Sequence, residues 1–509
     1  GQPNAMGGRE VGGLANMLAA HMGYGAAERD RVSRFWQAPN VPTAEGHKAV
    51  RLFEAIAAGE IKALWVIGTN PAVSLPRADA VREAMRGLEL LVVSDNVASN
   101  DTVDIACVRL PALAWGEKDG TVTNSERRIS RQRAFLRPPG EARSNWWMLA
   151  HVARRLGHGA AFDYAGPAAI FREHAALSAF ENDGTRVFDL SGLADITDAE
   201  YDALEPIQWP VRRGADGRPE GTARLFADGG FQTETGRARF VSPIATRPAA
   251  AAARLPASPE GFDLVLNTGR VRDQWHTMTR TGLSPRLAGH IAEPFVELHP
   301  RDAARLGLAQ GALARVETKH GTATLKVLVS EGVRSGEVFV PIHWSGANSS
   351  GGRIGALVHG ETDPWSGQPD SKATRARVSA VVVTHYGFVL TRGNPSARLS
   401  SPLVAEAANA CPRPAGADAA APLAYWARAP FADGTITFVA LDATESDARG
   451  FVEALLPEGD RLTIADEGSG LHRAAALVDG RLETVVFLGH EPTLPSPEWL
   501  KSRFAAIAI

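Results

Sequence analysis

Cysteine is nearly absent from this 509-residue chain, which contains only Cys107 and Cys411. Two cysteines cannot build a disulfide framework, so the composition suits a reducing compartment; we expect Cys107, which lies in an apolar run, to be a buried structural thiol. No unbroken apolar run reaches membrane-spanning length, and the formal net charge of -3 gives no basic footprint for nucleic acid. We therefore expect a cytoplasmic protein without a nucleic-acid or membrane partner.

Several signatures of nucleotide-binding and hydrolytic enzymes are also missing. The sequence has no GxxxxGK[ST] loop, no GxGxxG after a strand, no HExxH and no GxSxG, which argues against P-loop NTPases and α/β-hydrolases. The first residues, GQPNAMGGREVGG, contain neither a charged n-region nor an apolar h-region, and they lack an initiator Met. We expect the chain to begin inside a polar, Gly-rich loop and to be truncated at its start.

A strand–helix–strand pattern begins at residue 63. The runs ALWVIG and LELLVVSD are short and apolar, and RADAVREAMRG between them has helical spacing, which predicts a parallel α/β layer. Asn70 follows the first strand, and Ser94 and Asp95 end the second. Because ligands bind outside the carboxyl ends of parallel strands, Asn70 and Asp95 are candidates for reading a nucleotide. The competing interpretation is an ordinary Asn-Pro turn and a strand-terminating Asp. We also expect helices at residues 14–21 and 44–58.

From residue 262 the sequence contains many short strands with Gly turns, which predicts a closed barrel. The segment NTGRVRDQWH directly follows the first of these strands. Gly269 permits close backbone approach, Arg270 offers a planar fork for phosphate, and Trp275 with His276 supplies a stacking surface and a hydrogen-bonding ring. The competing interpretation is a turn with a surface Arg and a core Trp. The histidines of this region do not have metal-ligand spacing.

The predicted domain organisation has four parts. Residues 1–60 open with the Gly-rich loop and continue into helical segments, and residues 61–250 form an α/β region. Residues 260–385 form the barrel, after an Ala-rich linker. Residues 386–509 form a small α+β C-terminal extension, with a helix at SDARGFVEALL and a hairpin that turns at Asp479-Gly480.

Together these segments resemble the molybdopterin oxidoreductases related to dimethyl sulfoxide reductase, and within them the assimilatory nitrate reductase catalytic subunits. QPNAMGGREVGG is similar to the loop that approaches molybdenum, and WVIGTNP, VVSD and WGEKDGTVTNSERR are similar to dinucleotide-binding segments. LNTGRVRDQWHTMTR, ELHPRDAARLGLAQGALARVET and DPWSGQPDSKATRARV resemble the C-terminal molybdopterin-binding domain, a double-psi β-barrel. The resemblance covers residues 1–385 and implies a bis-molybdopterin guanine dinucleotide cofactor that carries molybdenum. It also implies that residues 1–60 end a central α/β domain with an active-site loop, and that residues 61–250 form an α/β dinucleotide-binding domain.

The resemblance also implies site residues. One dinucleotide would be held by Asn70, Ser94, Asp95, Lys118 and Asn145, and the other pterin arm by Thr268, Gly269, Arg270, Trp275, His276, Asn348 and Lys372. Many relatives have an acid where Asn145 stands. Lysine is scarce, with seven residues against 47 arginines, yet two of the seven occupy lysine positions of the family. Arg9 matches an arginine near the substrate channel, where its guanidinium suits a planar oxyanion, and Gln2 is a second candidate.

The implied activity is reduction of nitrate to nitrite, with electrons from flavodoxin, ferredoxin or an NADH-dependent reductase. The [4Fe–4S] motif of the family and its molybdenum ligand are not in this sequence, and the tail resembles an extension that precedes a [2Fe–2S] domain in some members. We therefore expect the chain alone to be inactive toward nitrate. Two alternatives stay open: a formate dehydrogenase or other sibling, and a non-catalytic nucleotide-binding protein.

Overall fold

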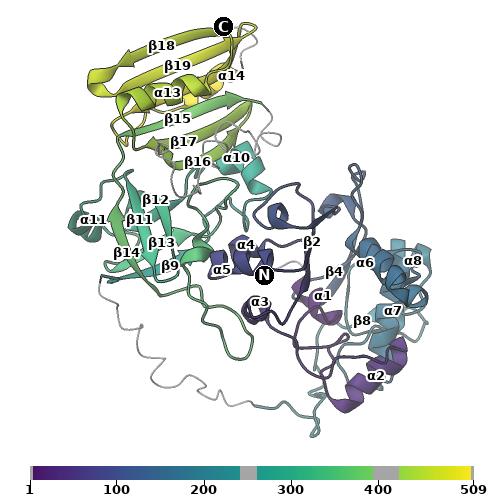
Figure 1. The fold of residues 1–509 in the computed structure, drawn as a ribbon. Helices are drawn as coiled ribbons and strands as arrows, with labels where there is room; N and C mark the ends of the chain where they lie inside the picture. The colour runs from purple at the N-terminus through teal and green to yellow at the C-terminus, as the bar shows by residue number, and fades with distance from the viewer. Residues whose placement is uncertain (1–3, 241–260, 394–422, 506–509) are drawn as a thin grey trace.

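The computed structural model describes residues 4–240, 261–393 and 423–505 (Figure 1). An N-terminal α/β region is followed by a closed barrel and by a C-terminal antiparallel sheet with two helices. This arrangement confirms the predicted fold class. The main elements of the first region are α1 (Ala5–Glu10), α2 (Ala26–Trp36), α3 (Ala49–Ala57), β1 (Ala63–Ile67), α4 (Pro71–Ser74), α5 (Ala78–Arg86), β2 (Leu90–Asp95), β3 (Val108–Pro111), β4 (Gly120–Thr123), β5 (Arg128–Gln132), α6 (Asn145–Ala153), α7 (Pro167–Ala179), α8 (Asp198–Asp202), β6 (Ile207–Gln208), β7 (Val211–Arg213) and β8 (Pro219–Gly221).

Strands β1, β2 and β3 form the predicted parallel sheet, in that order. Ile67 lies opposite Ser94, so the carboxyl ends of β1 and β2 coincide. The apolar runs that predicted these strands pack with α3 and α5 into one buried cluster that includes Val66, Leu91 and Met85. Because the strands are parallel, the segments that leave their carboxyl ends emerge at one edge of the sheet.

The expected helix at residues 14–21 is absent, and the expected opening loop is partly helical. Residues 14–21 are bends and turns, and Ala20 and His21 have positive φ values of 54° and 57°, which an α-helix does not allow. In contrast, α1 forms despite its glycines because Glu10 is buried at its end. The Glu10 carboxylate accepts hydrogen bonds from Trp209 Nε1 at 2.6 Å and Thr123 Oγ1 at 2.8 Å. Contacts with residues distant in the sequence therefore determine the conformation of this segment.

The prediction for Cys107 was also wrong, because its thiol is exposed. Cys107 lies just before β3, which is an edge strand of the three-stranded sheet, and neighbouring Val108 is 39% exposed. The apolar character of this run therefore does not reflect complete burial. Cys411 lies outside the described residues.

The barrel contains six strands, so the closed barrel predicted from residue 262 onward is confirmed. Its elements are β9 (Leu264–Gly269), α10 (Pro285–Ala288), β10 (Phe295–Leu298), α11 (Pro300–Leu306), β11 (Leu313–Thr318), β12 (Gly321–Val329), β13 (Glu337–Pro341) and β14 (Thr374–Ala380). The strands close in the order β10-β12-β11-β14-β9-β13 around a core of aliphatic side chains such as Leu266, Leu325 and Val338. β11 and β12 form a hairpin in which Thr318 pairs with Gly321.

The C-terminal sheet has the order β16-β17-β15-β20-β19-β18 and is antiparallel. Its elements are β15 (His385–Arg392), β16 (Leu423–Phe431), β17 (Gly434–Leu441), α13 (Glu445–Leu455), β18 (Asp460–Asp466), β19 (Leu471–Val478), β20 (Arg481–Gly489) and α14 (Glu498–Phe504). Val389 packs in the cluster that contains α13 residues, whereas Phe388 and Leu390 pack on the other face with Phe504 of α14. Because successive side chains of a strand point to opposite faces of the sheet, α13 packs on one face and α14 on the other. The predicted hairpin and helix are both present.

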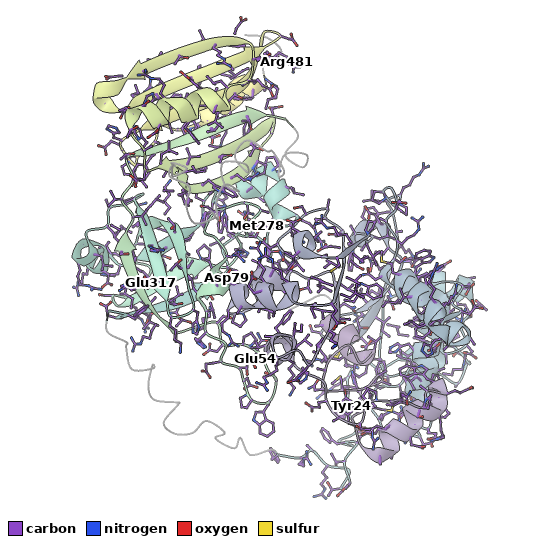
Figure 2. The ribbon with its side chains drawn as sticks, in the orientation of Figure 1. Tyr24, Glu54, Asp79, Met278, Glu317 and Arg481 are labelled. Carbon is purple, nitrogen blue, oxygen red and sulfur yellow. The ribbon has the colours of Figure 1, made fainter. Side chains whose placement is uncertain are left out.

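Polar contacts join the three regions. Asp79 of α5, labelled in Figure 2, forms an ion pair with Arg353 at 2.6 Å, and the Asp101 carboxylate accepts from Gly346 N at 3.1 Å. Tyr425 Oη in the C-terminal sheet donates to Glu293 Oε2 of the barrel region at 3.2 Å. Within the described ranges, no helix has both the length and the apolar content needed to cross a bilayer.

Candidate functional site

A cavity of about 320 Å³ lies between the parallel sheet and the loop that follows β9. Its walls come from the carboxyl edge of β1 and β2, from the segment after β3, from the start of α6 and from the barrel loop. Its lining residues are Gly68, Thr69, Asn70, Ser74, Ser94, Asp95, Asn96, Ala112, Leu113, Lys118, Asn145, Trp275, His276, Thr277, Thr279 and Arg280. Seven of the predicted site residues are therefore brought together, although up to 206 positions separate them in the sequence.

On the sheet side, β1 and β2 deliver Asn70, Ser94 and Asp95 to one place, as predicted. The Ser94 hydroxyl is buried and accepts from Trp65 Nε1 at 2.8 Å. The Asp95 carboxylate accepts from Asn96 N at 2.7 Å and Asn100 Nδ2 at 3.1 Å. Each carboxylate oxygen has more than one lone pair, so Asp95 can also accept from the amino and imino groups of a purine.

The Asn70 side chain has a role that its position in the sequence did not reveal. Its Oδ1 accepts from Thr102 Oγ1 at 2.7 Å, and its Nδ2 donates to Thr277 Oγ1 at 3.2 Å. The amide is only 6% exposed. Asn70 therefore ties the sheet to the barrel loop and shapes the cavity, with one wall fixed against the other.

Two cations from different segments line the cavity: Lys118, which follows β3, and Arg280 of the barrel loop. Burial lowers the pKa of Lys118, and the nearby Arg280 guanidinium lowers it further, although Glu117 opposes the shift. No hydrogen bond or ion pair within the described parts of the chain engages Lys118 Nζ or the Arg280 guanidinium. Asn145 Oδ1, at the start of α6, is buried and has no hydrogen-bond partner there. Burying a carbonyl oxygen without a hydrogen bond costs free energy, so a ligand that donates a hydrogen bond to this atom would be stabilised.

His343 holds the barrel loop in place through both of its ring nitrogens. His343 Nε2 is 3.0 Å from Val271 N, and its Nδ1 is 2.7 Å from the His276 carbonyl oxygen. These contacts require that Nε2 accepts and Nδ1 donates, and burial, which lowers the pKa of His343, favours that neutral ring. The loop thereby presents Trp275, which is 45% exposed, to the cavity.

Five predicted residues of the barrel do not line this cavity. The Lys372 ammonium donates to the Thr268 carbonyl, and the Thr268 hydroxyl donates to Ser371 O at 2.8 Å. A Cβ on Gly269 would lie 2.7 Å from the Phe339 ring, so the close approach of this ring explains the glycine. Arg270 is exposed beyond β9.

Asn348 is the fifth of these residues. Its Oδ1 accepts from Ser345 N at 2.8 Å, and its Nδ2 lies 3.6 Å from Met278 Sδ, so it supports the barrel loop. Met278 is labelled in Figure 2. The cofactor contacts assigned to these five residues remain predictions.

Arg9, which was predicted to lie near the substrate, is not among the residues that line the cavity. Arg9 is exposed on α1, and its charge helps to lower the pKa of His21, after the larger effect of burial. Arg9 does not pair with Glu10, whose carboxylate faces Thr123 and Trp209. Gln2 lies outside the described residues. A substrate role for either residue remains a prediction.

The cavity suits a diphosphate-linked nucleotide. Lys118 and Arg280 are placed to neutralise phosphate oxygens, and Asp95 and Asn145 Oδ1 are acceptors for the edge of a base. The Trp275 indole offers a surface on which a ring can stack. Thr277, Thr279 and Arg280 were missed, because only the closure of the barrel loop onto the sheet brings them here. The residues present therefore fit a dinucleotide arm.

The comparisons with known proteins agree with this geometry. Residues 4–155 match the molybdopterin oxidoreductase family, and residues 264–375 match the molydopterin dinucleotide binding domain. The chain belongs to the molybdopterin oxidoreductases. In this molybdopterin oxidoreductase chain, the cavity lies where the two matched regions meet: its sheet wall falls in the first region, and Trp275 to Arg280 fall in the second.

Three related proteins are similar to this chain over two thirds or more of its length. A nitrate reductase of Klebsiella oxytoca is 50% identical over 392 residues, which are 77% of this chain and 44% of that protein. The assimilatory nitrate reductase catalytic subunit of Bacillus subtilis is 32% identical, over 74% of this chain and 51% of that protein. The F420-dependent formate dehydrogenase subunit alpha of Methanocaldococcus jannaschii is 32% identical, over 68% and 48%. The chain spans about half the length of these relatives.

Proposed function

We propose that this chain belongs to a cytoplasmic molybdenum enzyme that reduces nitrate to nitrite. In this proposal the cavity between the parallel sheet and the barrel loop holds one guanine dinucleotide arm of a bis-molybdopterin cofactor. The observation that carries it is that Lys118 and Arg280, which have no hydrogen bond or ion pair in the described part of the chain, line one cavity with the acceptors Asp95 and Asn145 Oδ1 in a molybdopterin oxidoreductase. The 50% identity to a nitrate reductase supports the choice of substrate.

The chain's own residues would bind and orient the cofactor. Lys118 and Arg280 would contact the diphosphate, and Asp95 would accept from the guanine. His343 would keep the barrel loop in place through its two ring nitrogens. When bound, the molybdenum cofactor supplies the oxygen-transfer and redox chemistry of nitrate reduction. Electrons would arrive through a [4Fe–4S] cluster, and a [2Fe–2S] centre in some members, from flavodoxin, ferredoxin or an NADH-dependent reductase.

A test of cofactor and activity uses the enzyme that contains this chain, purified after growth with molybdate. We expect molybdenum and acid-released guanine in a ratio of about one to two, and nitrite formation from nitrate with a reduced viologen. Absence of guanine would overturn the cofactor assignment. Guanine without nitrite formation would overturn the substrate assignment and leave the cofactor assignment standing.

Arg9 is the proposed substrate residue. Its guanidinium is exposed, and nitrate is a planar anion that suits a bidentate donor. The substitution Arg9→Lys keeps the charge and removes the fork, so it should weaken nitrate use by about 1–3 kcal/mol, the range for a hydrogen bond to a charged group. Molybdenum content should stay unchanged. Unaltered kinetics, or loss of the cofactor, would remove Arg9 from the substrate site. Gln2 is a second candidate for the same pocket.

Oxidation of formate is the second candidate function, because formate dehydrogenases are similar to this chain at 28–32% identity. The same purified enzyme should be assayed with formate and a viologen acceptor. Formate oxidation without nitrate reduction would select this alternative.

A further inference from the structure

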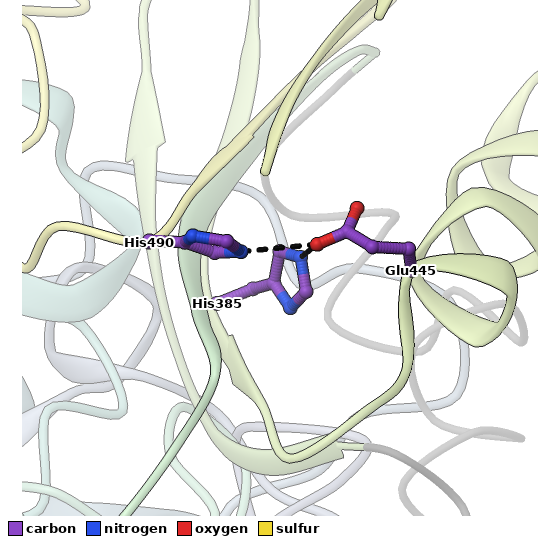
Figure 3. Close-up of side chains that lie close together, drawn as sticks. All are labelled: His385, Glu445 and His490. Atoms are coloured by element: carbon purple, nitrogen blue, oxygen red, sulfur yellow. Dashed lines mark hydrogen bonds and ion pairs between the residues drawn. The ribbon is translucent and has the colours of Figure 1, made fainter. Parts of the chain in front are cut away.

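Three histidines and one glutamate meet at one end of the C-terminal sheet, outside both regions that match the family. Figure 3 shows His385 and His490 directed at the carboxylate of Glu445. His472 contacts the same carboxylate from β19. Neither the cofactor cavity nor the proposed nitrate chemistry uses this cluster, so a role for the cluster is independent of the proposed function.

Strand register explains how these distant residues meet. His385 begins β15, and the pairing of Tyr386 with Gly489 places His490 beside it, one step beyond β20. His472 lies on β19, opposite Leu488. All three positions have the parity of Val389, Ala474 and Leu488, which pack on the α13 face. The histidine side chains therefore project from three neighbouring strands toward the same helix.

The start of α13 supplies the carboxylate. Thr444 caps the helix: its hydroxyl accepts from Asp447 N, and its own N–H donates to Asp447 Oδ2. This capping box fixes Glu445 at the first helical position. Across the sheet, Gly470 leaves room for His490, since a Cβ at residue 470 would lie 1.9 Å from His490 Nε2.

The distances match the first coordination sphere of a small cation. Glu445 Oε1 is 3.1 Å from His385 Nε2 and 3.0 Å from His490 Nε2, and the three ligand atoms lie within 4.8 Å of one another. With metal–ligand bonds of about 2.0–2.1 Å, the edge of a tetrahedron is roughly 3.3 Å. His472 Nε2 binds the other oxygen, Oε2, at 2.9 Å and so orients the carboxylate.

The surroundings of His385 favour a free electron pair on Nε2. Its Nδ1 is 2.9 Å from Thr384 Oγ1, and this hydroxyl can donate its single proton to Ala443 O, also at 2.9 Å. Oγ1 then accepts the Nδ1 proton, which leaves the Nε2 electron pair facing the carboxylate oxygen. A cation between the two atoms converts this repulsion into coordination. Metal-bound histidines use their second nitrogen in this way.

We propose that His385, Glu445 and His490 bind a divalent transition-metal ion of the Zn²⁺ class, with His472 as a positioning residue. Two imidazoles and one carboxylate are ligands that suit such an ion. His490 is 45% exposed at its side chain, so the fourth position opens to solvent. The ion fastens the start of α13 to β15 and to the end of β20.

The test uses the full chain, prepared without a polyhistidine tag, freed of metal with a chelator and titrated calorimetrically with Zn²⁺. We expect one ion per chain, a rise in thermal midpoint with Zn²⁺ because the ion binds the folded state, and the visible absorption of four-coordinate Co²⁺ as a spectroscopic substitute. His490→Ala and Glu445→Gln should each abolish this binding. Because His490 is partly exposed, its variant also tests binding without emptying the core.

His472 is tested by a variant pair. His472→Ala should weaken Zn²⁺ binding about 10–100-fold, the usual effect of losing an orienting partner, and His472→Gln, which restores an N–H donor, should recover most of it. His47→Ala is the matched control, because His47 lies on the surface, 3.7 Å from Glu60. The alternative is a carboxylate that only accepts three N–H bonds. Zn²⁺ binding that is absent, or that is equal in wild type and His490→Ala, would establish that alternative and overturn the proposal.

Discussion

The cofactor cavity and the C-terminal cluster both collect polar side chains from distant parts of the chain, but they are built on opposite plans. In the cavity, Lys118, Arg280 and Asn145 Oδ1 are spread over separate walls and do not contact one another through hydrogen bonds in the described residues. In the cluster, three imidazole nitrogens converge on one carboxylate within about one coordination shell. A site with scattered, unengaged groups needs a long ligand, whereas convergent groups suit a single ion.

The two sites also differ in what holds them together. The cavity forms between two regions that have separate cores, and hydrogen bonds such as Asn70 to Thr277 join its walls. The cluster lies within one sheet and one helix that share a core. Substitutions near the cavity should therefore separate ligand binding from stability more clearly than substitutions in the cluster.

The largest expected effect is on the cavity's positive charge. Lys118→Met keeps the length of the side chain but removes its charge-assisted hydrogen bonds, so guanosine diphosphate, used as a probe, should bind about 10–100-fold more weakly. Calorimetric titration measures this change. Lys62→Met, which removes an exposed lysine paired with Glu89, should leave binding unchanged. Equal effects of the two variants would contradict the division of roles in the comparison.

The two asparagines of the cavity sharpen the comparison. Asn70→Ala leaves the Thr102 and Thr277 hydroxyls without their partner, so the free energy of unfolding should fall by about 1–3 kcal/mol. Asn145→Ala removes an Oδ1 that has no hydrogen-bond partner among the described residues, so it should weaken binding of the probe while changing the free energy of unfolding by less than about 0.5 kcal/mol. Urea unfolding and titration of both variants measure the contrast. A large stability loss in Asn145→Ala would show that its side chain is structural.

A third test concerns Glu10. Its carboxylate accepts hydrogen bonds from neutral donors, whereas the Glu445 carboxylate contacts three histidine rings. Burial raises the pKa of Glu10 above its ordinary 4.5, although hydrogen bonds from Thr123 and Trp209 oppose the shift. The folded state therefore holds the proton more tightly, and this contribution to stability is complete below pH 4.5 and lost as pH rises through the folded-state pKa. Glu10→Gln cannot titrate, so its urea midpoint relative to wild type should increase across this window. A constant difference would contradict the assignment.

The smallest expected effect is that of a substitution in one site on ligand binding at the other site. Because the cavity and the cluster share no residue, His490→Ala should change the binding of guanosine diphosphate by less than about 0.5 kcal/mol, the usual limit for independent positions. Lys118→Met should likewise leave Zn²⁺ titration unchanged. A measurable effect in either direction would show that the two sites are coupled through the barrel.

Local sequence patterns predicted the elements that carry the cavity. The apolar runs around Val66 and Leu91 predicted a parallel sheet whose ends bring Asn70 and Asp95 together, because strand direction alone fixes that edge. Arg280 and His343 were not found, since their positions depend on how the barrel loop closes onto the sheet.

The C-terminal cluster was hidden for a similar reason. His385, Glu445, His472 and His490 have no metal-ligand spacing in the sequence, and strand register makes them neighbours. For residues 14–21 the prediction was wrong in the opposite direction. Their composition predicted a helix, but the segment forms turns that include residues with positive φ.

The hydrogen bond between Asn70 and Thr277 has a consequence for the order of events during synthesis. One wall of the cavity is complete when residue 145 has been made, but the other needs residues 275–280, which leave the ribosome much later. A ligand that needs both walls can enter only after that point, and once inside it braces two separately packed regions against moving apart. Binding of the ligand should therefore slow proteolysis of the chain, because the ligand completes the contact between the two regions.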